Sequence, residues 1–334
     1  LAQALSARGD DATAEALFRR ALAIREKVLG PDHPDTAATL MLLGACLFDQ
    51  KDLAAAEPVL RRSVAIREKV LGSENADTAW SMQVLAQVLA TKKDYAGAEA
   101  LYRRVLAIRE KVMGPEHPDT AASLTALGAI LAIEGDHVTA EQLFRRALAI
   151  REKVLGPEHP DTIVSLMALA NTLFFKADYV GAEPMFRRAL AIQEKVLGPE
   201  HLEVATTSYM LALNLANKKD YAEAESLYRR SLAIQEKILG PNRPEIALTL
   251  TALGSVLSAK DDYSGAEPLF RRALAIREKV LGPEHPDTAT AMTVLGAFLF
   301  DKGDYLGAEP LHRRALAIRE KTLGPEHPDT AASL

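Results

Sequence analysis

The fold is decided by residues 145–162, RRALAIREKVLGPEHPDT, because this stretch recurs along the whole chain with few changes. The copies follow one another at a constant interval of 42 residues, without insertion or deletion. A fixed period of about 20 to 50 residues is typical of a solenoid, in which each unit buries its apolar side only by stacking on the next. We therefore expect an extended surface rather than a closed pocket. The period is read from the dipeptide Arg-Arg, which begins at residues 19, 61, 103, 145, 187, 229, 271 and 313.

One copy of the unit predicts a pair of helices. Apolar residues recur at helical spacing over residues 118–134 and again over residues 140–155. Gly135 and Asp136 lie between the two helices and supply a turn residue and a carboxylate that can cap the second helix. Gly156 suits the left-handed backbone that commonly ends a helix. The unit is therefore predicted to be helix, turn, helix and loop.

Prolines have two different places in the unit. Pro160 opens the following first helix, where its missing N–H costs nothing. Four copies also carry a proline inside the second helix, where it removes one backbone hydrogen bond. We expect these helices to bend slightly without breaking. The four prolines are Pro58, Pro184, Pro268 and Pro310.

Composition and charge limit the classes of function. The chain has 334 residues, of which 48% are hydrophobic and 25% charged, as is typical of a well-packed protein rather than a disordered one. The net charge is -5, so no excess of positive charge can hold a phosphate backbone, and we expect no nucleic-acid partner. No long apolar run predicts a membrane span, so we expect no membrane partner.

The sequence offers little to catalysis. The single cysteine, Cys46, cannot form an internal disulfide, which fits a reducing, cytoplasmic compartment. It lies within a predicted helix rather than at a helix start, so no feature activates its thiol. A glycine-rich phosphate loop and a His-Glu-x-x-His zinc motif are both absent from the sequence. We therefore expect no enzymatic activity, no metal and no cofactor.

The Arg-Arg dipeptides and the loop histidines each allow two interpretations. In every copy a glutamate stands four residues before the first arginine, as Glu141 does before Arg145, which favours a surface ion pair worth about 0.2 to 0.5 kcal/mol. Two rows of phosphate-binding guanidinium groups are the alternative. Stacked helices lie about 8 to 10 Å apart, too far for neighbouring loops to share a metal, so the histidines are predicted to form turn-stabilising hydrogen bonds. They are His33, His117, His159, His201, His285 and His327.

Several small and aromatic positions carry a family resemblance: Leu127, Gly128, Gly135, Asp136, Ala140, Phe144 and Ala147. Their spacing reproduces the tetratricopeptide repeat (TPR), whose usual unit is about 34 residues. With a longer second helix, the unit resembles the repeats of kinesin light chains and their bacterial relatives, over the entire chain. The resemblance implies an all-α fold, a right-handed α-solenoid superhelix of antiparallel helix pairs, as one domain over residues 1–334 with about eight repeats. It also implies a protein-protein interaction scaffold whose first helices line a concave groove that binds a peptide or protein.

A stripe of the first helix is predicted to face this groove. It runs through the positions of Ala122, Thr125, Ala129 and Ala132, and it is where the copies differ. Aromatic and methionine side chains there are favoured anchors for a partner, although the alternative is that they fill gaps against the next repeat. The candidate partner-binding residues are Phe48, Trp80, Gln83, Gln87, Met167, Asn171, Phe174, Tyr209 and Phe300.

The two ends of the sequence carry partial helices. Residues 1–8 correspond to the later part of a first helix and residues 329–334 to the start of another, so both ends are expected to expose apolar surface. We expect the chain to be a piece of a longer array, with weak head-to-tail self-association through these ends. Two alternatives to the scaffold stay open: the sensor or oligomerisation arm of a larger signalling protein, and a self-assembling structural array.

Overall fold

The computed structural model describes residues 1–331 and 333, and the regular structure of these residues is helical throughout. The chain divides into two compact units, Leu1–Lys176 and Ala177–Leu334. The first unit contains α1 (Ala2–Ser6), α2 (Asp11–Leu29), α3 (Pro34–Asp49), α4 (Leu53–Leu71), α5 (Ala76–Thr91), α6 (Tyr95–Val112), α7 (Pro118–Ile133), α8 (His137–Val154) and α9 (Pro160–Phe175). The second contains α10 (Tyr179–Leu197), α11 (Leu202–Asn217), α12 (Tyr221–Leu239), α13 (Pro244–Ala259), α14 (Tyr263–Leu281), α15 (Pro286–Asp301), α16 (Tyr305–Leu323) and α17 (Pro328–Ala331).

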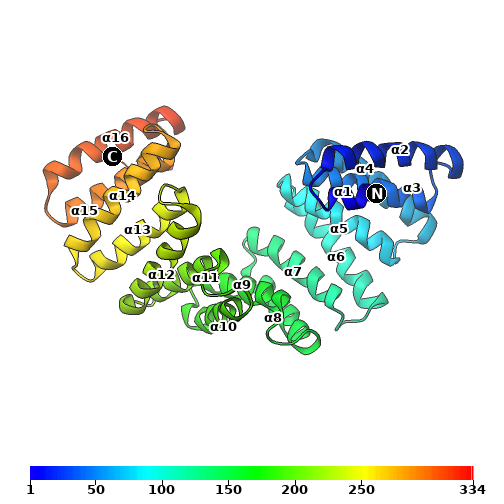
Figure 1. Ribbon diagram of the computed structural model, residues 1–334, viewed down its shortest axis with the longest axis horizontal. Coiled ribbons are helices and arrows are strands. Elements are labelled where there is room, and N and C mark those ends of the chain that lie inside the picture. The colour runs from blue at the N-terminus through cyan, green and yellow to red at the C-terminus, as the bar shows by residue number, and fades with distance from the viewer. Residues whose placement is uncertain (332, 334) are drawn as a thin grey trace. The chain divides into compact units, whose positions relative to one another are not determined.

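The predicted all-α solenoid of paired helices is confirmed (Figure 1). We call the odd-numbered helices α3 to α15 the A helices and the even-numbered helices α2 to α16 the B helices. Within each unit, an A helix packs against the B helix that follows it, and a B helix packs in turn against the next A helix. The predicted partial helices correspond to α1 and α17, although residues 332 and 334 of the second prediction lie outside the described residues. The single-domain boundaries stay a prediction.

Contacts between successive repeats are closest on the side of the A helices. In the first unit α3 contacts α5 and α7 contacts α9, and in the second unit α11 and α15 both contact α13. No two described B helices of the same unit approach as closely. Stacked helices that approach more on one side curve toward that side. This agrees with the expectation that the A helices line the inner face of each unit.

The predicted caps are confirmed. Asp136 precedes α8 and its Oδ1 accepts a hydrogen bond from the backbone N–H of Thr139 at 3.0 Å, and an aspartate holds this place before every B helix. Gly156 has a φ of +94°, as the loop after a B helix requires. His159 caps α9, since its Nδ1 accepts from the N–H of Asp161 at 3.1 Å. The loop histidines therefore form the predicted turn-stabilising hydrogen bonds.

Close packing inside a repeat depends on a small residue. Gly128 of α7 lies against the ring of Phe144 from α8, and a Cβ at Gly128 would come within 2.8 Å of that ring. Leu124, Phe144 and Ala147 are buried in the core of this repeat. The prolines inside α4, α10, α14 and α16 do not break these helices, as predicted.

The two arginines of each Arg-Arg dipeptide have different partners. The first pairs with the glutamate four residues earlier in all eight copies, as predicted, for example Arg103 with Glu99 at 2.7 Å. In several copies of each unit the second reaches the preceding B helix, as Arg104 reaches Glu68 at 2.5 Å and Arg272 reaches Glu236 at 2.5 Å. The sequence analysis missed this second set of pairs. Ion pairs on the surface of the B helices therefore connect neighbouring repeats as well as neighbouring turns of one helix.

Candidate functional site

The A helices carry one buried face and one partly exposed face. Leu124 and Leu127, on the predicted core stripe, are 0% and 2% exposed. The predicted groove stripe is more open, and its Ala122 position holds Trp80, Val164 and Leu248 in three of the copies. These three side chains are 52%, 51% and 52% exposed. Each unit therefore presents apolar side chains to solvent along its A helices.

The nine candidate partner-binding residues lie on five A helices. Only α5 and α9 carry more than one of them. Trp80, Gln87 and Phe300 are exposed, and the other six are half-buried. By helix, the candidates are Phe48 on α3, Trp80, Gln83 and Gln87 on α5, Met167, Asn171 and Phe174 on α9, Tyr209 on α11 and Phe300 on α15. The structure thus groups three of them on each of two helices of the first unit and distributes the remainder.

Two of the aromatic candidates have different surroundings. The ring of Tyr209 meets that of Tyr228 edge-on, with centroids 5.4 Å apart, and Tyr228 is 1% exposed. Burial raises the pKa of the Tyr209 hydroxyl. Phe300, by contrast, is 58% exposed and contacts the exposed ring of Tyr305 at a centroid distance of 5.1 Å. Tyr209 therefore contributes to the core of its unit, whereas Phe300 remains on the surface.

Gln83 is hydrogen-bonded to one of a set of arginines that the sequence analysis did not identify. Its Oε1 accepts a hydrogen bond from Nη2 of Arg109 at 2.5 Å, and Nη1 of Arg109 also donates to Ser123 Oγ at 2.7 Å. Gln83 lies on α5, Arg109 on α6 and Ser123 on α7, so one guanidinium group joins the A helices of two successive repeats. We call the residues at this position the inter-repeat arginines. They are Arg25, Arg67, Arg109, Arg151, Arg277 and Arg319, and Gln193 and Gln235 replace them in two copies.

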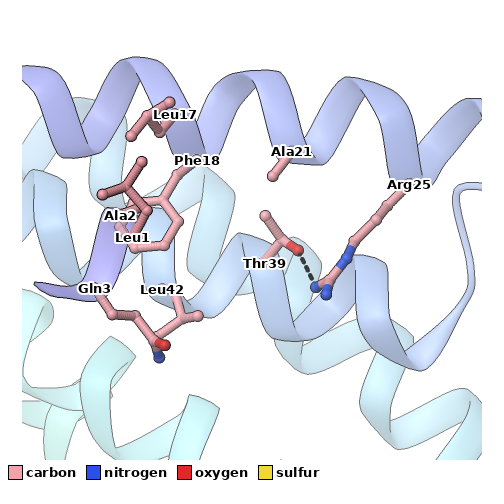
Figure 2. A pocket seen from close by; sticks show the side chains of 9 residues that line it. All are labelled: Leu1, Ala2, Gln3, Leu17, Phe18, Ala21, Arg25, Thr39 and Leu42. Atoms are coloured by element: carbon pink, nitrogen blue, oxygen red, sulfur yellow. Dashed lines mark hydrogen bonds between the residues drawn. The ribbon is translucent and has the colours of Figure 1, made fainter.

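The inter-repeat arginines are charged groups largely withdrawn from solvent. Arg67, Arg151 and Arg277 are 5%, 6% and 8% exposed, and burial lowers the pKa of each guanidinium. Figure 2 shows Arg25, whose Nη1 donates to Thr39 Oγ1 at 2.6 Å at the edge of a pocket of about 310 Å³ between α1, α2 and α3. A sequence signal for the set did exist. The positions three and four residues away from Arg151 on its helix are apolar, which places the arginine on the packed face.

A larger pocket, of about 520 Å³, opens between α7, α8 and α9. Alanines of α7 and the ring of Phe144 line its apolar part, and His137 and Asn171 bring polar atoms to it. His137 Nδ1 and Asn171 Oδ1 are buried without a hydrogen-bond partner among the described residues. The imidazole of His137 stacks on the exposed ring of Phe175, with centroids 6.0 Å apart and an interplanar angle of 11°. Of the nine candidates, Asn171 is the one that lines this pocket.

The described residues contain no group of three or more His, Cys, Asp or Glu side chains placed to hold a metal ion. Cys46 is 1% exposed, and burial raises the pKa of its thiol. No helix among the described residues is both long and apolar enough to cross a membrane.

Comparison with protein families identifies the repeat. A model described as tetratricopeptide repeat matches residues 1–69, 35–111, 77–153, 119–195, 169–237, 203–279 and 245–297, and a second with the same description matches residues 288–329. Together these matches extend over nearly the whole chain. None of the curated proteins is significantly similar in sequence.

Solved structures of similar fold include relatives of kinesin light chains. TPR-like repeats ascribed to a kinesin light chain of Podosopora anserina are 27% identical, with a TM-score of 0.56, and the match covers 62% of this chain and 98% of that one. BtubC (BKLC) from P. vanneervenii is 25% identical, with a TM-score of 0.57 and coverage of 71% and 92%. The apo form of RapI, at 17% identity, a TM-score of 0.65 and coverage of 85% and 98%, is similar in fold alone. The resemblance to the kinesin-light-chain type of repeat is confirmed.

Proposed function

The chain belongs to the tetratricopeptide repeat family, and from this we propose that it is a scaffold that binds a peptide or a protein surface along its A helices. Repeats of this family generally bind proteins and are typically non-catalytic, because a stacked array offers a long surface rather than an enclosed reaction site. We propose that this chain likewise has no catalytic activity of its own. A cytoplasmic location stays a prediction.

The exposure of Trp80 supports this proposal most strongly. A tryptophan is costly to leave in water, and tryptophan is among the commonest residues that dominate the energy of protein interfaces. Trp80 is the only tryptophan of the chain and is 52% exposed on α5. Gln83 and Gln87, one and two turns further along the same helix, add hydrogen-bonding groups beside it. An apolar anchor with neighbouring amides suits a peptide that also presents polar backbone groups.

Selection of peptides against the intact chain tests the proposal. Random peptides displayed on phage would be selected against the protein. The affinity of each selected peptide would be measured from the fluorescence of Trp80, the only tryptophan of the protein. We expect Trp80→Ala, measured by calorimetry, to weaken binding about tenfold or more. Val70→Ala is the matched control, since Val70 is 45% exposed on the B helix α4 of the same unit. Peptides that bind the Trp80→Ala variant as tightly as the parent would overturn the proposal.

The two alternatives predicted from the sequence, a signalling arm and a self-assembling array, have no observation of their own among the residues described. Light scattering of the chain over a range of concentrations separates the self-assembling array from the scaffold. A mass that grows continuously with concentration, together with no selected peptide, would favour the array.

A further inference from the structure

We infer that the pocket between α7, α8 and α9 receives a tyrosine side chain of the bound partner. The inference rests on the proposed function, because it names the residue that one part of the A-helix surface recognises. Three independent features of the pocket carry it: the space that it leaves relative to other copies of the repeat, the polar atoms in its wall and the apolar side chains at its rim.

The array itself indicates that the space suits an aromatic ring. In the copy formed by α15 and α16, the positions of Ala132 and His137 are held by Phe300 and Tyr305, whose rings lie 5.1 Å apart in an edge-on arrangement. The copy that forms the pocket, α7 and α8, has the small Ala132 in place of the phenyl ring of Phe300. It has the imidazole of His137 in place of the phenol of Tyr305. Four further copies also carry tyrosine at the His137 position. A ring supplied by a partner would restore packing that another repeat makes with its own side chains.

The polar wall selects among aromatic rings. His137 Nδ1 and Asn171 Oδ1 are both buried without a hydrogen-bond partner among the described residues, which is an unfavourable state for polar atoms in a folded protein. The terminal torsions of histidine and asparagine are soft, so a small rotation can turn either atom toward the pocket. A phenol hydroxyl both donates and accepts, so it can donate its proton to the amide oxygen of Asn171 while it accepts from the imidazole of His137 in the tautomer that carries the proton on Nδ1. An indole only donates, and a phenyl ring does neither.

The rim of the pocket is apolar where other repeats are polar. Ile133 and Phe175, which line the pocket, are 58% and 68% exposed. The Ile133 position is polar in most other copies, which carry Asp49, Thr91, Asn217 and Asp301 there. A local cluster of exposed large apolar side chains marks a contact surface. The rim can therefore cover the residues that flank the inserted tyrosine in a partner segment.

The direct test uses p-cresol, the side-chain analogue of tyrosine, with toluene and 3-methylindole as analogues of phenylalanine and tryptophan. Methyl groups of isoleucine and alanine would be labelled and followed by NMR during titration. We expect p-cresol to shift the signals of Ile133, Ala129 and Ala132, with a Kd of about 1 mM or weaker, as suits so small a ligand. Toluene and 3-methylindole should bind at least about threefold more weakly, because neither can both donate and accept.

Two variants make the test specific. Ala132→Phe should abolish the p-cresol shifts, because it supplies the ring found in the α15 copy. Its matched control is Ala90→Phe, at the same position of α5 in the same unit, which should leave them unchanged. Asn171→Leu, which introduces the residue that Leu213 provides in the next copy, should remove the preference for p-cresol over toluene.

The inference is overturned if p-cresol shifts none of these methyl signals, if Ala132→Phe leaves the shifts in place, or if toluene or 3-methylindole binds as well as p-cresol. Its failure is distinguishable from failure of the proposed function. Peptides that depend on Trp80 but ignore Ala132→Phe would support the scaffold and exclude the tyrosine pocket.

Discussion

Arg109 and Gln83 lie in different repeats, and a hydrogen bond of 2.5 Å joins Nη2 of the arginine to Oε1 of the glutamine. The same guanidinium group donates to Ser123 on the next A helix. One planar side chain with five N–H donors thus spans the junction between two helix pairs. Since the repeats of a solenoid are held only by their neighbours, contacts at this junction contribute directly to the stability of the array.

We therefore predict that removing an inter-repeat arginine is costly. Arg151 is 6% exposed, and its Nη1 donates to Thr125 Oγ1 at 3.0 Å and to Ser165 Oγ. Arg151→Ala should lower the free energy of unfolding by about 2 kcal/mol, because it leaves buried hydroxyl groups without their donor. Arg151→Gln should cost less, since Gln235 holds this position in another copy and accepts from Thr249 Oγ1 at 2.8 Å. Urea unfolding followed by circular dichroism measures both.

Arg145→Ala is the control for this experiment. Arg145 lies on the same helix, but its side chain is 58% exposed, and Lys176 also pairs with Glu141, the carboxylate that Arg145 contacts. Its removal should change the free energy of unfolding by no more than about 0.5 kcal/mol. Equal effects of Arg145→Ala and Arg151→Ala would show that burial at the junction is not the source of the stability.

The repeat architecture could be predicted because it depends on local signals that recur. Asp136 before a helix, Gly156 after it and Pro160 at the next start each act within a few residues, and the structure has them in the expected roles. The inter-repeat arginines were missed for a physical reason. Arg151 meets Ser165 across a helix junction 14 residues away, and its sequence pattern shows only that it lies on the packed face of its helix.

The candidate site could be predicted only in part. The stripe on the A helices was identified from variation between copies, and Trp80 and Phe300 are exposed there. The pocket could not be found in this way, because it combines a small side chain, Ala132, with His137 of the following helix and Asn171 of the next repeat. None of these residues alone indicates a pocket, and only the packing of three helices brings them together.

Acid should weaken the contacts between repeats, and Glu57 is a suitable probe. It accepts from Lys92 of the next repeat at 2.5 Å and from Arg61 at 2.8 Å, and these bonds lower the pKa of its carboxyl group. The unfolded chain keeps an ordinary value of about 4.3, so the stabilisation is present above that pH and is lost as the pH falls through the lower pKa of the folded state. Glu57→Gln should cost about 1 kcal/mol at pH 7 and almost nothing at about pH 3, measured by urea unfolding.

Glu309→Gln is the matched control for this pH dependence. Glu309 is 58% exposed and, among the described residues, pairs only with Arg313 of its own helix. Its substitution should change the free energy of unfolding by about 0.3 kcal/mol at pH 7. A cost of Glu57→Gln that persisted undiminished at pH 3 would contradict an electrostatic origin.

The A-helix caps offer a route to a more stable protein. Asn75 replaces the usual histidine before α5 and still accepts from the N–H of Asp77 at 2.8 Å, whereas Arg243 before α13 makes no side-chain cap. Arg243→Asn should therefore raise the free energy of unfolding by about 0.5 to 1 kcal/mol. Arg243→Ala should have little effect, because alanine has no acceptor. Thermal unfolding of the three proteins decides the matter, and an equal gain from alanine would exclude capping as the cause.

The thiol of Cys46 should react slowly until the first unit opens. It is 1% exposed, its Sγ lies 3.5 Å from the carbonyl oxygen of Asp11, and burial raises its pKa. Because the thiolate is the reactive form, both the lack of access and the raised pKa slow attack on a disulfide reagent such as DTNB. We expect release of the coloured thiolate to be far slower than from the protein in urea.

Gln50 donates to Sγ at 3.6 Å and opposes the rise in pKa, so Gln50→Ala should slow the reaction further if the thiol reacts within the folded unit. A faster reaction in Gln50→Ala would instead indicate that loss of the bond from Gln50 to Asp11 loosens α2 from α3, and that opening controls the rate.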